Sequence, residues 1–143
     1  MEFITKSDQE TKNLALNLTK NLKGGEMLAL YGELGSGKTT FVQGLAKGLG
    51  IKRRVISPTF LIVRTYSIEH KEAKFFFHID LYRIEKGEDI KSLGILELLN
   101  NPENIVAIEW ADRMDNLLPK RRIDIYFEVG DNNKRQIKVL DHG

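Results

Sequence analysis

The most specific chemistry in this chain lies in the segment Gly32-Glu-Leu-Gly-Ser-Gly-Lys38-Thr39, which matches the pattern G-x-x-x-x-G-K-[ST]. Its glycines adopt backbone angles that are closed to residues with side chains, so the main chain can approach phosphate oxygens closely. The N–H groups of such a loop form an anion-binding nest at the positive end of the following helix. Lys38 is expected to reach the β- and γ-phosphates, and the Thr39 hydroxyl group to ligate Mg²⁺. The pattern predicts a nucleoside triphosphate site.

The elements around this loop favour the same interpretation. Residues 27–31 are apolar and follow Gly24-Gly25, which predicts a buried strand, and residues 40–49 have the composition of a helix that ends at Gly50. A strand, a glycine-rich loop and a helix in this order are the context in which the pattern is specific. A plain glycine-rich turn is the alternative.

The rest of the chain predicts an α/β fold of the P-loop NTPase class, with helices flanking a mixed, mostly parallel central sheet and antiparallel strands at the C-terminal edge. A capping box, Ser7-x-x-Glu10, opens the first helix. We expect a long-looped hairpin over residues 59–80, and a helix that continues through Gly94. The further predicted elements are helices at 8–22 and 88–99, and strands at 59–66, 74–80, 105–109, 123–129 and 135–140.

Composition limits the class of protein. The 143 residues fit a single domain over 1–143, and no repeat or linker divides them. The 22 basic and 20 acidic residues leave a net charge of +2, too slight to predict a nucleic-acid surface. The chain has no cysteine, which excludes disulfides and thiol catalysis and suits the cytoplasm. No signal-peptide pattern or apolar run of ~18 residues occurs, so neither secretion nor membrane insertion is expected.

Two acidic residues, Asp80 and Glu109, end apolar strands. Ligands gather at the carboxyl ends of strands in open α/β sheets, and Mg²⁺ takes oxygen ligands. Either acid could hold the metal, and each could instead be the first solvated residue after its strand. Strand positions alone do not decide between them.

Three further clusters carry polar or aromatic groups. The segment Ser57-Pro-Thr-Phe60 lies where other P-loop enzymes keep a nucleotide-sensing switch, although it also fits a proline turn. The segment His78-Ile-Asp-Leu-Tyr-Arg83 gathers polar groups at a strand end; its histidine is either structural or catalytic. Trp110 would ordinarily belong to the core or to an interface.

Taken together and in this order, GELGSGKTT, SPTF, HIDLYR and IEW resemble the bacterial TsaE (YjeE) family, the ATPase component of tRNA threonylcarbamoyladenosine synthesis. The similarity extends from the region of Thr11 to the closing strands. Glu33, Ser36 and Ala111 depart from the residues common in the family. None of these departures removes a phosphate-contacting or acidic group.

The resemblance implies a Mg²⁺-dependent ATPase and assigns roles by position. Thr39 and Glu109 would hold Mg²⁺, and Asp80 would act with Lys38 as a catalytic residue beside the γ-phosphate. Thr59 would be the switch-like threonine. The residues expected to contact ATP are Thr11, Gly35, Ser36, Gly37, Lys38, Thr39, Thr40, Thr59 and Trp110.

The resemblance also implies a partner, the TsaD–TsaB heterodimer, which transfers threonylcarbamoyl to the adenosine beside the anticodon. ATP binding and hydrolysis would support assembly and turnover of that complex, and tRNA would be met only through it. The near-neutral charge agrees with this expectation.

Two other functions remain open. A small-molecule kinase would add an acceptor pocket and an arginine-bearing lid, for which Arg53-Arg54 and Arg121-Arg122 are the only adjacent arginine pairs. A non-hydrolysing nucleotide sensor would use the same loop for binding alone. A GTPase is disfavoured because no Asn-Lys-x-Asp motif occurs; Asn133-Lys134 is followed by Arg135-Gln136.

Overall fold

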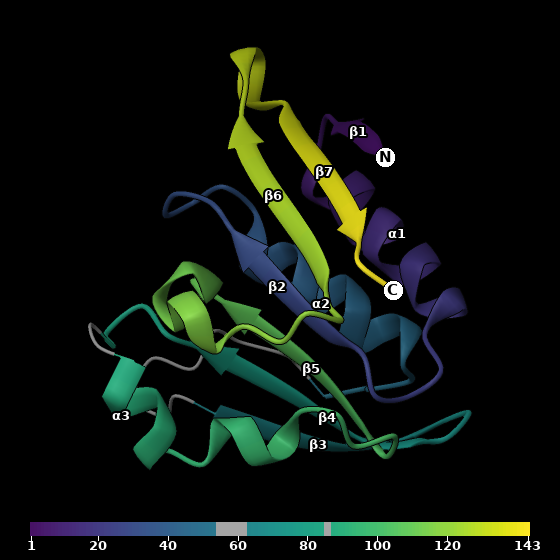
Figure 1. The fold of residues 1–143 in the computed structure, drawn as a ribbon. Helices are drawn as coiled ribbons and strands as arrows, with labels where there is room; N and C mark the ends of the chain where they lie inside the picture. The colour runs from purple at the N-terminus through teal and green to yellow at the C-terminus, as the bar shows by residue number, and fades with distance from the viewer. Residues whose placement is uncertain (54–62, 85–86) are drawn as a thin grey trace.

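The computed structural model describes residues 1–53, 63–84 and 87–143, and these residues contain one mixed sheet of seven strands (Figure 1). The four strands β6, β2, β5 and β4 run parallel, whereas β3 and β7 are antiparallel to their neighbours. The expected α/β fold with a mixed sheet is confirmed. The order across the sheet is β1 (Glu2–Thr5), β7 (Arg135–Asp141), β6 (Ile123–Val129), β2 (Met27–Tyr31), β5 (Asn104–Glu109), β4 (Ala73–Asp80) and β3 (Val63–His70).

Helices cover both faces of this sheet. α1 (Asp8–Leu18) and α2 (Lys38–Gly48) pack on one face, and α3 (Gly87–Ser92) lies on the other with short 3-10 turns (Figure 1). Successive residues of β2 point to opposite faces, so Leu28 joins the core under α1 and α2 while Ala29 joins the second core. Strand β5 is buried at all six positions, as expected for a parallel strand covered on both sides.

The parallel centre of the sheet brings its strand ends together. In the register of the sheet, Glu109 at the end of β5 lies beside both Leu30 of β2 and Asp80 of β4. The loop that begins at Gly32 therefore starts at the same edge of the sheet as the two acids.

The N-terminal helix begins where the sequence predicts. The Ser7 hydroxyl oxygen accepts a hydrogen bond from the Glu10 backbone N–H at 3.1 Å, and the Glu10 carboxylate accepts one from Lys6 N–H at 3.0 Å. The α-helix ends at Leu18, earlier than predicted, and a 3-10 turn over Thr19–Asn21 follows.

Two predictions about local structure are wrong. The expected long loop between β3 and β4 is short, because alternating burial of Tyr66 and Ile68 extends β3 to His70, and Lys71 turns the chain with φ 54°. The expected helix over 88–99 is interrupted, because Gly94 adopts φ 73° and a 3-10 turn replaces the second half. The predicted strand at 59–66 is observed from Val63, and residues 59–62 lie outside the described part.

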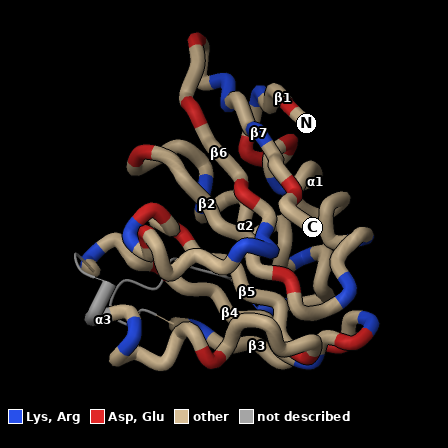
Figure 2. The backbone as a smooth tube through the Cα atoms, in the orientation of Figure 1, with Lys and Arg blue, Asp and Glu red and all other residues tan. Residues whose placement is uncertain are grey.

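Strand β1 was not predicted. It is only four residues long, and it pairs antiparallel with β7, so this strand rather than the C-terminal one forms the edge of the sheet. Charges of both signs are interspersed along the backbone (Figure 2). Among the described helices, none is sufficiently long and apolar to cross a membrane.

Candidate functional site

The glycine-rich loop joins β2 to α2 with backbone angles that require glycine. Gly35 has φ 80° and Gly37 has φ 108°, and Gly37 is the N-cap of α2. A Cβ atom on Gly32 would lie 2.6 Å from Ser36 Oγ and 2.8 Å from the carbonyl oxygen of Phe127. The loop is thus tightly packed against the end of β6, and its amides are at the N-terminus of α2, where the helix dipole favours anions.

Lys38 folds back over its own loop. Its Nζ donates to the carbonyl oxygens of Gly32 and, at 3.0 Å, of Glu33. Burial lowers the pKa of the Lys38 amine, while the nearby carboxylates of Glu109 and Asp80 act in the opposite direction. The ammonium group is therefore held at the mouth of the loop by main-chain oxygens.

The indole ring of Trp110 covers this ammonium group, with Nζ of Lys38 4.2 Å from the ring centroid. Trp110 has φ 58°, a left-handed conformation that is unfavourable for a bulky residue. This sharp turn directly after β5 carries the ring over Lys38. The ring of Tyr82 also packs against the indole, with 5.1 Å between the ring centroids. Strain of this kind is common at functional sites.

A buried chain of hydrogen bonds runs from α2 to β4. The Thr39 hydroxyl group donates to Glu109 Oε1 at 3.0 Å, and Glu109 Oε2 lies 2.5 Å from His78 Nε2. His78 is fully buried and Glu109 is only 3% exposed. Among the described residues, Nδ1 of His78 has no hydrogen-bond partner. The histidine orients the carboxylate, and the carboxylate meets the threonine hydroxyl group.

The pair formed by Thr39 and Glu109 fits the oxygen-ligand chemistry of Mg²⁺. The two groups belong to α2 and β5, yet their oxygens are 3.0 Å apart at the mouth of the loop. Asp80 lies one strand further out, and its carboxylate accepts a hydrogen bond from Tyr82 N–H at 3.0 Å. Glu109 therefore bonds Thr39 directly, whereas Asp80 ends the neighbouring strand.

The structure does not bring every candidate residue to the loop. The Thr11 hydroxyl group lies 2.7 Å from that of Thr5 and also donates to the carbonyl oxygen of Ser7, which ties α1 to β1. Thr40 lies in the first turn of α2. Thr59 lies outside the described residues.

One residue near the loop has no role in the sequence-based prediction. Arg135, at the start of β7, donates from Nη2 to the carbonyl oxygen of Gly35 at 3.3 Å. Its alternating strand pattern gave no sign of this contact, because the contact joins positions 100 residues apart.

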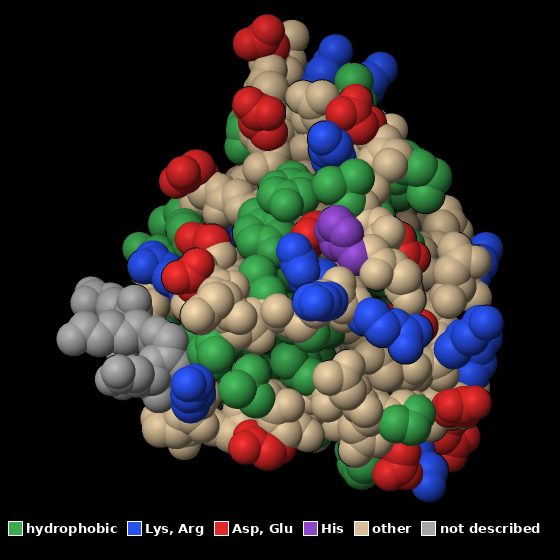
Figure 3. All heavy atoms as spheres, viewed as in Figure 1, with side chains coloured by type: hydrophobic (Ala, Val, Ile, Leu, Met, Phe, Trp, Pro, Cys, Tyr) green, Lys and Arg blue, Asp and Glu red, His purple; other side chains and the backbone are tan. Residues whose placement is uncertain are grey.

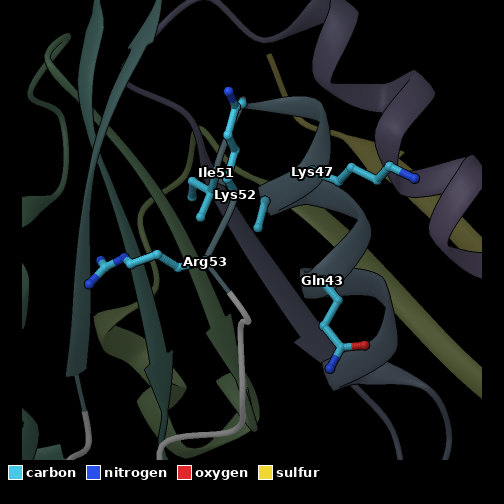
Figure 4. A pocket seen from close by; sticks show the side chains of 7 residues that line it. Gln43, Lys47, Ile51, Lys52 and Arg53 are labelled. Carbon is cyan, nitrogen blue, oxygen red and sulfur yellow. The ribbon is translucent and has the colours of Figure 1, made fainter.

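The described members of the two arginine pairs considered for a kinase lid, Arg53, Arg121 and Arg122, do not contact the loop in any recorded interaction. Arg122 donates a hydrogen bond to Asp124 at 2.9 Å, and Arg121 donates to the carbonyl oxygen of Gly143. Both arginines lie at the start of β6, which runs parallel to β2, so they are at the amino ends of these strands, whereas the loop is at the carboxyl ends. Arg53, Lys47 and Lys52 line an open hollow of about 480 Å³ past the C-terminal end of α2, and the side chains of Arg53 and Lys47 point away from each other (Figure 4). Arg54 lies outside the described residues.

Fold and site together define an α/β protein in which a glycine-rich loop, a lysine and a threonine–glutamate pair meet at the carboxyl edge of a mixed sheet. The sequence profile of the family described as threonylcarbamoyl adenosine biosynthesis protein TsaE matches residues 5–137. The chain belongs to the TsaE family.

Relatives with this description are similar over nearly all of the chain. The protein of Rickettsia felis is 38% identical over 140 residues, covering 96% of this chain and 78% of the relative. That of Bacillus subtilis is 35% identical over 137 residues, covering 96% and 83%. Both are described as tRNA threonylcarbamoyladenosine biosynthesis protein TsaE. The crystal structure of Bacillus subtilis YdiB superposes with a TM-score of 0.83 at 31% identity, covering all of this chain and 86% of that one.

Proposed function

We propose that this protein is a Mg²⁺-dependent ATPase of the P-loop class that serves tRNA threonylcarbamoyladenosine synthesis. The observation that carries the proposal is the contact between Thr39 and Glu109 at the mouth of the glycine-rich loop. A hydroxyl group and a carboxylate at this place are the two protein ligands that P-loop enzymes offer to the magnesium of Mg-ATP. Membership of the family supports the pathway.

Each site residue has a task in this proposal. The amides from Gly35 to Thr40 bind the phosphates, and Lys38 leaves its carbonyl partners to pair with the β- and γ-phosphates. Thr39 and Glu109 would hold Mg²⁺, and the bound ion would supply positive charge beside the phosphates. Asp80, the register partner of Glu109 on β4, would orient the attacking water.

His78 acts through Glu109. Its Nε2, 2.5 Å from Glu109 Oε2, fixes the direction of that carboxylate and leaves Oε1 facing Thr39. A positioned ligand of this kind lowers the cost of assembling the metal site, since its rotamer is already set. His78 is therefore a positioning residue in this scheme.

The proposed partner is the TsaD–TsaB heterodimer, which transfers threonylcarbamoyl to the adenosine beside the anticodon in the cytoplasm. Binding and hydrolysis of ATP would support assembly and turnover of the complex, and tRNA would be met through the partner. The net charge of +2 suits a protein that does not grip tRNA by itself.

The test is a phosphate-release assay with Mg-ATP, with and without the TsaD–TsaB heterodimer, followed by measurement of modified tRNA. We expect phosphate release that rises with the heterodimer, and tRNA modification that needs this protein. Phosphate found on an added metabolite would instead select the kinase. ATP binding without hydrolysis, even with the heterodimer, would select the sensor.

A further inference from the structure

Arg135 reaches from β7 to the glycine-rich loop and lies along its outer side. Nη2 donates to the carbonyl oxygen of Gly35 at 3.3 Å, and Nη1 donates to that of Asn133 at 2.9 Å. A Cβ atom built on Gly37 would lie 3.7 Å from Arg135 Nε and 3.9 Å from its Cδ and Cγ. The side chain thus passes alongside two of the loop glycines. Two main-chain oxygens, one bound to each Nη atom, fix the plane of the guanidinium group.

The order of the strands tells which end of a bound nucleotide this side chain would meet. Glu109 and Asp80 end β5 and β4, on one side of β2, whereas Arg135 belongs to the strands on the other side (Figure 1). In the proposed function the acids mark the magnesium and the terminal phosphate. The nucleoside then leaves the loop toward β6 and β7, where Arg135 lies.

The chemistry of the side chain suits the base better than the phosphates. Lys38 already supplies a cation to the phosphates, and two N–H groups of Arg135 are bound to carbonyl oxygens. A guanidinium group fixed in this way offers its planar face, which stacks on aromatic rings. The chain also lacks the Asn-Lys-x-Asp motif that reads a guanine edge, so a stacking contact would take its place.

We propose that Arg135 binds the nucleoside end of ATP, with its guanidinium plane stacked on the adenine base. The inference rests on the proposed function, because it takes the loop to be a triphosphate site. Arg135 is thereby a substrate-binding residue that the motif pattern does not contain.

The test compares ATP with ribose 5-triphosphate, which keeps the phosphates and sugar but lacks the base. Calorimetry measures ATP affinity, and displacement of ATP measures the affinity for ribose 5-triphosphate. We expect Arg135→Ala to weaken ATP binding about 3- to 30-fold and to leave ribose 5-triphosphate binding nearly unchanged. Arg121→Ala, an exposed arginine at the opposite edge of the sheet, is the matched control and should change neither affinity.

Arg135→Lys separates the planar group from the charge. Lysine retains a donor for the Gly35 carbonyl oxygen but has no plane to stack, so ATP should bind as weakly as to Arg135→Ala. Full ATP affinity in the lysine variant would overturn the stacking contact. Equal losses for both ligands would assign Arg135 to the phosphates or to loop support, and unchanged ATP affinity would remove it from the site. Wild-type protein that bound neither ligand would refute the proposed function itself.

Discussion

At the scale of single residues, Lys38 shows how an anion site is arranged before its ligand arrives. Its ammonium group takes carbonyl oxygens of Gly32 and Glu33 as partners and lies under the Trp110 ring. A buried cation needs such partners, since burial without them is costly. Phosphate oxygens would replace the carbonyl oxygens when a nucleotide binds.

The first prediction concerns this lysine. Lys38→Ala should weaken ATP binding roughly 10- to 100-fold, because a charge-assisted contact with the phosphates is lost. Calorimetric titration with Mg-ATP measures the change. Lys47→Ala, in the exposed last turn of the same helix, is the control and should bind like wild type. Unchanged affinity in Lys38→Ala would mean that the triphosphate does not lie in this loop.

The second prediction uses the only tryptophan in the chain. The Lys38 ammonium group lies 4.2 Å from the centroid of the Trp110 ring. If it moves away when ATP binds, the fluorescence emission of Trp110 should change. A fluorescence titration records the change and gives an affinity that should agree with calorimetry. Lys38→Ala should show little of this signal, and a full signal in that variant would separate Trp110 from the motion of the lysine.

The third prediction concerns the metal. Glu109→Gln should strongly reduce Mg²⁺-dependent phosphate release, since a neutral amide is a weaker ligand than a carboxylate. The fold should remain, because the amide oxygen still accepts from Thr39. A Mg²⁺ titration of activity is the measurement, with Glu103→Gln, a partly exposed residue beside the start of the same strand, as control. If Mg²⁺ dependence persisted in Glu109→Gln, Asp80 would become the better candidate ligand.

At the scale of elements, the sequence predicts what is periodic or local. The strand–loop–helix unit and the Ser7 cap follow from short patterns, and both are observed. Gly94 defeats the helix prediction, because the apolar spacing continues past a residue whose φ of 73° ends the helix. The contact of Arg135 with Gly35 is tertiary, and no local pattern encodes it.

The two helices on one face of the sheet approach each other at a glycine. A Cβ atom on Gly44 of α2 would lie 2.4 Å from the carbonyl oxygen of Lys12 and 2.8 Å from the Ala15 Cβ atom in α1. Real Cβ contacts are not this short, so a side chain here must push the helices apart.

The fourth prediction follows from this contact. Gly44→Ala should lower the free energy of unfolding by about 1–3 kcal/mol, although alanine favours a helix by about 1 kcal/mol. Urea denaturation measures it. Gly130→Ala is the matched control, because its Cβ atom would meet only ordinary contacts at 3.6 Å or more, and its stability should change by less than about 0.5 kcal/mol. A stability gain in Gly44→Ala would show that α1 and α2 are not held this close.

At the scale of the whole molecule, one buried carboxylate connects three parts of the chain. Asp124 in β6 accepts hydrogen bonds from Tyr31 at 2.8 Å and Arg122 at 2.9 Å, and His142, beyond β7, lies 2.8 Å away. Burial alone would raise the pKa of Asp124, but the bonds from Arg122, Tyr31 and His142 outweigh it and lower the pKa. Burial of the Tyr31 hydroxyl group and its hydrogen bond to Asp124 raise the pKa of Tyr31.

The fifth prediction takes its sign from that lowered pKa. The hydrogen bonds to the ionised Asp124 carboxylate stabilise the folded state fully above the pKa of an unfolded aspartate, about 3.9. This stabilisation is lost as the pH falls through the lower pKa of Asp124 in the folded state. Asp124→Asn should therefore be less stable than wild type by about 2 kcal/mol at pH 7, and this difference should be smaller at pH 3. Urea denaturation at both pH values tests this. Asp141→Asn, an exposed neighbour, should track wild type throughout, and an unchanged gap at pH 3 would contradict the ionic origin.

Helices do not cover all strands of the sheet equally. In the described part of the chain, no helix crosses the front of β6 and β7 in the view of Figure 1, and hydrophobic side chains are visible there with basic ones beside them (Figure 3). Tyr126 in β6 is 41% exposed and its ring stacks on Tyr31 at 4.7 Å between centroids. The Tyr31 hydroxyl group donates to Asp124, so this stacked pair lies next to the buried carboxylate.

The pairing of β1 with β7 has a consequence for folding of the nascent chain on the ribosome. Strand β1 can pair only after β7 has left the exit tunnel, because Phe3 is in register with Ile137. Until then β1 lacks the strand with which it pairs, and this edge of the nascent sheet stays open. Closure of this edge thus depends on a contact between segments far apart in the sequence, rather than on the speed of local folding.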